Sequence, residues 1–160
     1  MLKRLLNDEI KVRMKVNLVQ SKKFSEMLEE AVRRYQNNLI TSAQIIEELI
    51  NLAKDIKESD RKGVDLNLDF REYAFYSALE VNDSAVKVIG DETLREIARE
   101  LVDTVKKNTS IDWTVRENVQ AKMRIAVKKI LRRHGYPPDM EAKATETVLE
   151  QAKLLADELN

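Results

Sequence analysis

The stretch Asp112–Asp139, DWTVRENVQAKMRIAVKKILRRHGYPPD, carries the start and stop signals of one long helix. Thr114 and Glu117 have the spacing of a capping box, in which a hydroxyl and a carboxylate bond to the free amides of the first turn. Gly135 follows the last helical position, where a left-handed residue closes a helix, and Tyr136 is placed to pack on the final turn. Two prolines then forbid continuation. These signals predict a helix of about 20 residues, roughly 30 Å long.

The predicted helix over residues 114–134 has two unlike faces. Apolar side chains at helical spacing form one face: Val115, Val119, Met123, Ala126, Val127, Ile130 and Leu131. Basic side chains form the other: Lys122, Arg124, Lys128, Lys129, Arg132 and Arg133. The segment holds seven basic residues and one acid, a net charge of +6, and the remainder of this formally neutral chain carries −6. A basic helix in an acidic remainder is therefore the main electrostatic feature.

The composition indicates a folded helical protein. The chain has 160 residues, 43% hydrophobic and 35% charged, which is enough for one domain with a core. Three glycines and two prolines leave little room for the turns of a β-protein. Cysteine is absent, which excludes a disulfide scaffold and is compatible with a cytoplasmic setting. No apolar run reaches membrane length and no signal-peptide pattern is present, so no membrane partner is expected.

Apolar residues at helical spacing predict an all-α fold, a single helical domain of seven or eight helices in a bundle-like packing. The alternation from Ile10 to Leu18 is a strand signal, but a lone strand is unstable, so we expect helix there to about residue 15. Thr41 and Gln44 form a second capping box. The expected helical segments are residues 2–15, 21–37, 41–58, 70–81, 84–89, 91–107, 114–134 and 138–159.

The same periodicity predicts which side chains are buried. The second helix should bury Phe24, Met27, Leu28, Ala31, Val32 and Tyr35. The third should bury Ile45, Ile46, Leu49, Ile50, Ala53 and Ile56. The helix over 70–81 is unusually aromatic, and because only Arg71 is interleaved we expect core packing rather than base stacking for Phe70, Tyr73, Phe75 and Tyr76. Asp60–Asp69, which contains Gly63, reads as the longest loop.

The motifs of catalysis are missing from the sequence. Neither a phosphate-binding loop nor a dinucleotide fingerprint occurs, since the three glycines stand apart. His134 has no cysteine or second histidine with which to bind zinc, and at a helix C-terminus it is expected to cap or pack. No strand-to-helix turn exists to present a nucleophile. We therefore expect no catalytic, cofactor-binding or metal-binding residues in this chain.

The stretch from Ile111 to Asp139 resembles the closing signature of the restriction subunit of type I restriction–modification enzymes. Upstream, LNDEIKVRMKVNLVQSKKFSEMLEEAVRRYQNN, SAQIIEELINLAK and EYAFYSALE are also similar to that family. The resemblance implies a nuclease domain and two ATP-driven motor domains followed by a helical C-terminal region, and only the last is similar to this chain. The parent enzyme would use ATP and Mg²⁺, and its catalytic residues correspond to no position here.

The resemblance also implies a domain arrangement. Residues 1–160 would form the C-terminal helical domain, with 1–58 a helical extension from the motor domains and 69–160 the compact part. The pattern already begins at Leu2, which suggests a segment of a longer chain. Three positions depart from the family's pattern: His134 replaces a common tyrosine, Gln120 a common basic residue, and Ser77 a common aspartate.

Three functions are compatible with the sequence. The first is an assembly module that docks the motor subunit onto the methyltransferase and specificity subunits. The second is direct contact with the DNA backbone through the basic residues of 114–134, which predicts weak and strongly salt-dependent binding. The third is an inert spacer. The first is favoured because it combines the resemblance with the missing catalytic motifs.

Arg116 is expected to have a structural role, together with Thr114, Glu117, Gly135 and Tyr136. It projects into the apolar arc of its helix, where an unpaired charge would be costly to bury. We therefore expect it to be partly buried and paired with a carboxylate. The candidate partners are Asp91, Glu92, Asp103 and Glu146.

Overall fold

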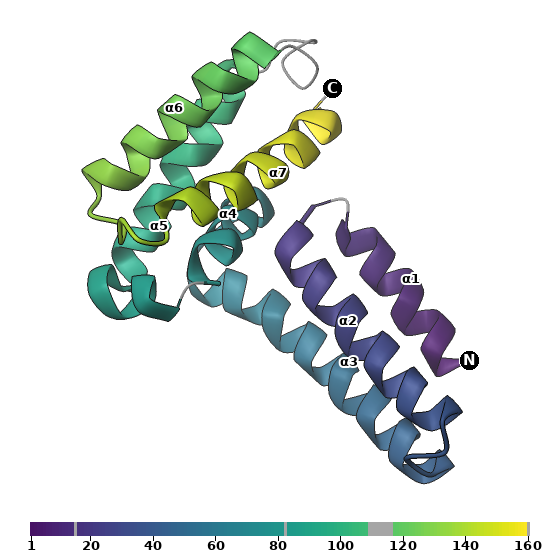
Figure 1. Ribbon diagram of the computed structural model, residues 1–160. Coiled ribbons are helices and arrows are strands. Elements are labelled where there is room, and N and C mark those ends of the chain that lie inside the picture. Colours follow the sequence, from purple (N-terminus) through teal and green to yellow (C-terminus); the bar gives the residue numbers. More distant parts are fainter. Residues whose placement is uncertain (15, 82, 109–116, 160) are drawn as a thin grey trace.

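A computed structural model describes residues 1–14, 16–81, 83–108 and 117–159. In these ranges the chain forms seven helices and no strand, so the all-α prediction is confirmed. The helices are α1 (Leu2–Met14), α2 (Leu18–Gln36), α3 (Ser42–Asp65), α4 (Phe70–Glu80), α5 (Asp83–Asn108), α6 (Glu117–Arg133) and α7 (Glu141–Leu159). Figure 1 shows α1, α2 and α3 side by side in one lobe and α4 to α7 packed together in the other.

Each lobe has its own apolar cluster. In the first, α1, α2 and α3 as far as Ile56 bury Leu6, Ile10, Phe24, Leu28, Ala31, Ile45, Leu49, Leu52 and Ile56. In the second, the largest fully buried side chains of α4 to α7 are Phe75, Tyr76, Leu79, Leu94, Ile97, Leu101, Leu131 and Leu155. The division falls within α3, whose C-terminal part leaves the first cluster and reaches α4 (Figure 1).

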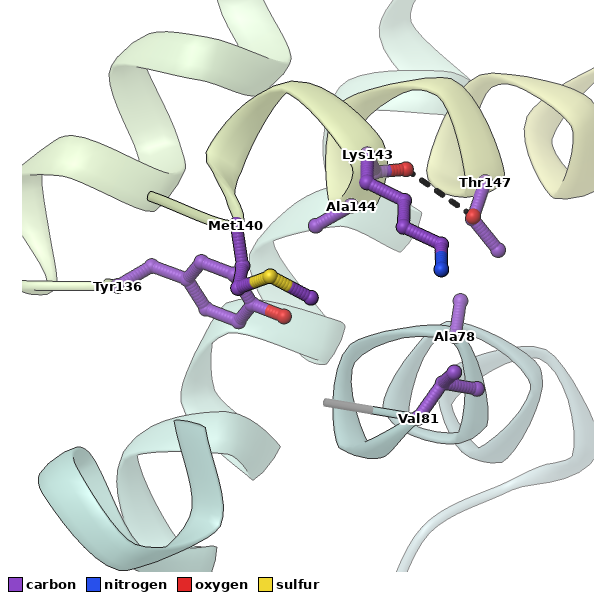
Figure 2. A pocket seen from close by; sticks show the side chains of 7 residues that line it. All are labelled: Ala78, Val81, Tyr136, Met140, Lys143, Ala144 and Thr147. Atoms are coloured by element: carbon purple, nitrogen blue, oxygen red, sulfur yellow. Dashed lines mark hydrogen bonds between the residues drawn. The ribbon is translucent and has the colours of Figure 1, made fainter. Parts of the chain in front are cut away.

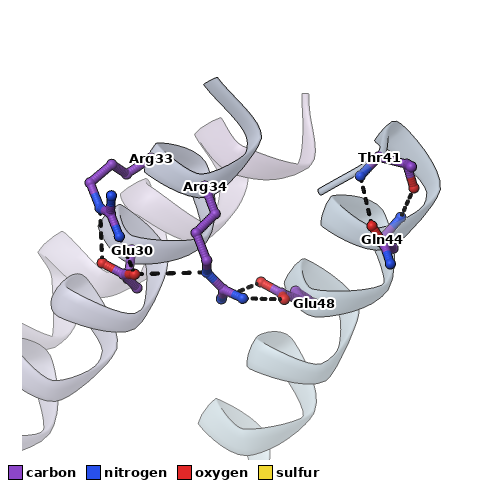
Figure 3. A network of polar contacts seen from close by, with 6 residues as sticks. All are labelled: Glu30, Arg33, Arg34, Thr41, Gln44 and Glu48. Atoms are coloured by element: carbon purple, nitrogen blue, oxygen red, sulfur yellow. Dashed lines mark hydrogen bonds and ion pairs between the residues drawn. The ribbon is translucent and has the colours of Figure 1, made fainter. Parts of the chain in front are cut away.

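The α2–α3 hairpin is closed by polar contacts at its tip (Figure 3). The capping box is present, since Gln44 N donates to Thr41 Oγ1 at 3.2 Å and Thr41 N to Gln44 Oε1 at 2.8 Å. Arg34 of α2 holds Glu48 of α3 through two hydrogen bonds of 2.9 and 2.8 Å. A bidentate pair fixes direction as well as distance, so it sets how the two helices lie.

Two helices end at an asparagine. Asn38 after α2 and Asn67 after α3 have φ values of 59° and 58°. In each case the amides of the asparagine and the next residue bond to carbonyls of the last turn at 2.8 to 3.1 Å, the Schellman pattern. Asparagine tolerates the left-handed conformation better than other residues with a side chain, which explains its use here.

The prediction of a loop over Asp60–Asp69 is wrong for residues 60–65, which are helical. α3 does not stop near residue 58 but continues to Asp65 with Gly63 inside it. A Cβ at position 63 would lie 3.1 Å from Cγ of Tyr73, so the glycine leaves room for the Tyr73 ring of α4 to pack against α3. The cost of a glycine in a helix, about 1 kcal/mol, is offset by this packing, which a local pattern does not reveal.

Three of the four aromatic residues of α4 are buried, as predicted: Tyr73, Phe75 and Tyr76. Phe70 contradicts the prediction, because its side chain is 54% exposed at the first position of the helix, and the Arg71 guanidinium lies 5.3 Å from its ring. Four further predicted core residues are also exposed at the edge of their helical stripes. They are Met27, Tyr35, Ile46 and Ile50.

The predicted break at Gly90 is present. Its φ of 79° and ψ of 164° are not helical, so α5 consists of two segments, 83–89 and 91–108. Just after the break, Asp91 accepts a hydrogen bond of 2.6 Å from the Tyr76 hydroxyl. Burial and this carboxylate both raise the pKa of Tyr76 far above its usual range, so the hydroxyl stays a donor at every physiological pH.

A buried polar network joins the two lobes. Gln151 of α7 is completely buried, accepts a 2.8 Å bond from the amide of Leu18 and donates a 3.0 Å bond to the carbonyl of Val16. Asn17, between them, donates a 3.2 Å bond to Ser77 of α4. The turn between α1 and α2 is therefore bound to two helices of the other lobe, which sets where the first lobe sits.

Replacing Gln151 with Leu should destabilise the chain by about 1–3 kcal/mol, because the partly buried amide of Leu18 and carbonyl of Val16 would lose their partner. Urea unfolding measures the change. Glu150→Ala, an exposed neighbour on the same helix, should shift the free energy of unfolding by less than about 0.5 kcal/mol. Equal effects from the two variants would contradict the role given to Gln151.

Gly63→Ala should lower the melting temperature although alanine is the better helix former. The Tyr73 ring in its way cannot move freely, since it stacks on Tyr76 with centroids 6.3 Å apart and its hydroxyl lies 3.1 Å from Ser59. Overpacking of this kind costs about 1–3 kcal/mol. Calorimetry tests it, with the exposed neighbour Val64→Ala as the control. A higher melting temperature for Gly63→Ala would show that the Tyr73 ring can move aside without cost, contrary to the prediction.

Candidate interaction surface

α6 ends as the sequence predicts. Gly135 has a φ of 79°, its amide bonds to the carbonyl of Arg132 at 3.1 Å, and the amide of Tyr136 bonds to that of Leu131 at 2.9 Å. A Cβ at position 135 would lie 3.9 Å from its nearest neighbour, Cγ2 of Ile89, so the conformation rather than space requires glycine. Tyr136 is buried and donates a 3.0 Å hydrogen bond to the carbonyl of Leu79.

The two faces of α6 separate as expected. The inward face buries Met123, Val127, Ile130 and Leu131, with Val119 and Ala126 half-buried. Five of the six basic residues of the predicted surface are exposed, and Lys128 is half-buried. Glu117 is the first described residue of α6 and is exposed. The predictions on Thr114, Val115 and Arg116 fall outside the described residues.

The arginines of α6 are held by carboxylates of the neighbouring helices. Arg124 Nε lies 3.0 Å from Glu146 of α7, and Arg132 Nε lies 2.9 Å from Glu141 of the same helix. On the other side, Arg133 pairs with Glu100 of α5. The other oxygen of Glu100 lies 2.7 Å from His134 Nε2. The acids thus balance the guanidinium charges along both flanks of α6.

The lysines of α6 have a different environment. Within the described part of the chain, no carboxylate lies within 4 Å of Lys122, Lys128 or Lys129. Between them, one turn from each, lies Ile125, whose side chain is 55% exposed. The outward face of α6 therefore presents three lysines around an apolar side chain, with neutralised arginines at its edges.

Sequence reasoning found the basic residues but missed two features of this surface. Ile125 was not singled out because it interrupts the basic face without belonging to the apolar stripe. The paired acids were missed because Glu141 and Glu146 follow in the next helix, and only the fold brings them to α6. Glu100 precedes His134 by 34 residues, and its position between Arg133 and His134 depends on how α5 packs.

A small pocket lies between α4, α7 and the turn before α7 (Figure 2). Its volume is about 50 Å³, and it is lined by Ala78, Val81, Tyr136, Met140, Lys143, Ala144 and Thr147. Cofactor sites are typically several hundred cubic ångströms, so this pocket is too small for a nucleotide. In the described ranges no group of three or more potential metal ligands occurs. None of the described helices is long and apolar enough to cross a membrane.

The fold and surface define an all-α module that presents a charged helix outward. Comparison with known proteins gives the family: residues 1–158 match the profile of the C-terminal region of type I restriction enzyme HindI endonuclease subunit-like proteins, and the chain belongs to this family.

Two curated relatives agree with this assignment. The chain is 38% identical over 158 residues to the type I restriction enzyme HindI endonuclease subunit of Haemophilus influenzae. The aligned region covers 99% of this chain and 15% of that protein. It is 35% identical over 152 residues to the putative type I restriction enzyme MjaIXP endonuclease subunit of Methanocaldococcus jannaschii. Here the aligned region covers 94% of this chain and 14% of the relative. The chain thus spans about one seventh of each relative's length. No solved structure matches it significantly.

Glu146→Gln should strengthen binding of this chain to duplex DNA of random sequence at low salt. Removing the carboxylate frees Arg124 for phosphate, so the slope of log K against log salt should steepen by about 1. Fluorescence anisotropy across a salt series measures both quantities. Glu150→Gln removes an equal charge from α7 without freeing an arginine. Identical slopes for the two variants would show that the pair does not mask Arg124.

Proposed function

We propose that this helical region is an assembly module that docks an ATP-dependent DNA translocase and endonuclease onto a methyltransferase–specificity core. The observation that carries the proposal is the family membership over 158 residues, within relatives described as endonuclease subunits of type I restriction enzymes. A region that forms two cores of its own can serve as a structural connection between larger parts.

The ion pairs of α6 support this proposal. A docking surface gains affinity when it is already ordered before binding, because less conformational freedom is then lost. Carboxylates from α5 and α7 hold α6 on both flanks, through Arg124, Arg132 and Arg133. Each exposed pair adds little stability by itself, but together they limit how the helix moves.

For the longer polypeptide we propose a type I site-specific deoxyribonuclease that uses ATP and Mg²⁺ in a bacterial or archaeal cytoplasm. The relatives' descriptions as endonuclease subunits support the nuclease activity. The catalytic groups would belong to regions outside residues 1–160. The methyltransferase and specificity subunits would be this chain's partners.

Direct DNA contact is the second candidate, and the three lysines of α6 favour it. Phosphate attraction needs only clustered positive charge, and the affinity falls steeply with salt. With the arginines paired, about three phosphate contacts remain, which predicts a salt slope of only about −3. Glu100, Glu141 and Glu146 also line the helix and would repel the backbone. This contact would therefore be weak.

Size-exclusion chromatography of the 160-residue chain mixed with a purified methyltransferase–specificity core tests the proposal. We expect a stable complex that elutes ahead of either component. A parallel titration with duplex DNA at physiological salt should show only weak binding. Separate elution of chain and core at micromolar concentration, combined with sub-micromolar DNA affinity, would favour the DNA contact instead.

A further inference from the structure

We infer that the outward face of α6 binds an acidic protein surface that has a small apolar depression at its centre. We call the face made by Lys122, Ile125, Lys128 and Lys129 the lysine-bordered face. The inference rests on the proposed docking function and deepens it by assigning the contact to one helix face. It also predicts the chemistry of the partner, which the family description does not contain.

The arrangement of the lysine-bordered face resembles a small protein interface. Ile125 has Lys122 three residues before it, Lys128 three residues after it and Lys129 four residues after it, so all three lysines are its neighbours on the helix surface. Protein interfaces place apolar side chains at the centre, where water is excluded, and polar groups at the rim. An exposed isoleucine with lysines at three of its neighbouring positions on the helix has this order.

The charges select an acidic partner. Among described residues, Lys122, Lys128 and Lys129 have no carboxylate within 4 Å, so they are available to carboxylates from outside. The neighbouring arginines are already paired with Glu100, Glu141 and Glu146. The uncompensated positive charge therefore lies on the lysine-bordered face itself, and opposite charge on a partner would steer association.

Ile125 distinguishes a protein partner from DNA. A phosphate backbone offers nothing apolar for an exposed isoleucine, whereas a protein surface can bury it. The planar fork of arginine matches phosphate better than the ammonium of lysine does, yet the arginines here are engaged. A face of free lysines around an isoleucine therefore fits carboxylates and an apolar depression better than it fits a duplex.

The test measures binding kinetics of the chain to the immobilised methyltransferase–specificity core, for two variants. Lys122→Gln/Lys128→Gln/Lys129→Gln removes the charged rim, and Ile125→Gln removes the apolar centre without changing charge. Rim charges act mainly on association, so the triple variant should associate about ten-fold more slowly at low salt and lose most of its salt dependence. A central apolar contact acts on lifetime, so Ile125→Gln should dissociate about ten-fold faster.

Matched controls come from the other lobe. Lys11→Gln/Lys54→Gln/Lys57→Gln removes the same charge from exposed positions of α1 and α3, and Val64→Gln replaces an exposed apolar residue of α3. Both should bind like wild type. Circular dichroism should show unchanged helicity in all four variants, because every substituted residue lies at least partly on the surface.

The outcomes separate the two hypotheses. Wild-type chain that does not bind the core overturns both the docking function and this inference. If the wild-type chain binds the core and both α6 variants bind it as well as the wild type does, only the assignment of the contact to the lysine-bordered face is overturned. If the triple variant loses DNA affinity while Ile125→Gln leaves core binding unchanged, the face serves DNA and the inference is wrong. The inference is supported if the triple lysine variant associates more slowly, Ile125→Gln dissociates faster, and neither control variant shows these changes.

Discussion

The position of the two lobes depends on one buried amide. The side-chain amide of Gln151 bonds through its oxygen to the amide of Leu18 and through its nitrogen to the carbonyl of Val16. No other glutamine among the described residues is fully buried. Because a buried amide must be satisfied on both sides, the turn between α1 and α2 can occupy only one place on α7. The bond between Asn17 and Ser77 extends the same constraint to α4. The hairpin of α1 to α3 is thereby fixed relative to the helices that carry the charged surface.

The neutrality of the whole chain conceals how its charges are distributed. Acids and bases are equal in number, yet α6 concentrates the bases and α5 and α7 supply the acids beside them. Arginines are neutralised and lysines are left open, so the surface potential of α6 is lower than its sequence suggests. Its effective charge is a property of the packing rather than of the helix alone.

Local signals predicted much of the fold, and long-range packing accounts for most of the errors. The capping box of Thr41 and the endings at Gly90 and Gly135 involve residues close in sequence, and all were recognisable. Asparagine is a known helix ending, but Asn67 was not predicted to end α3. The presence of Gly63 favoured a loop over residues 60–69, so the helix was predicted to end near residue 58. Gly63 lies inside α3 with the Tyr73 ring packed against it, and that contact is set by tertiary structure. The basic residues of the candidate site were visible as well, but their partners were not.

α3 gives the molecule a mechanical property that neither lobe has alone. Its 24 residues form one rod about 36 Å long that starts at the hairpin tip and ends against α4. A flexible loop over residues 60–69 would have absorbed displacement between the lobes, whereas a continuous helix transmits it. A displacement of the hairpin tip near Thr41 would be carried along this helix to Gly63, where the Tyr73 ring of α4 packs. The continuous helix therefore couples the position of the hairpin tip to that of α4.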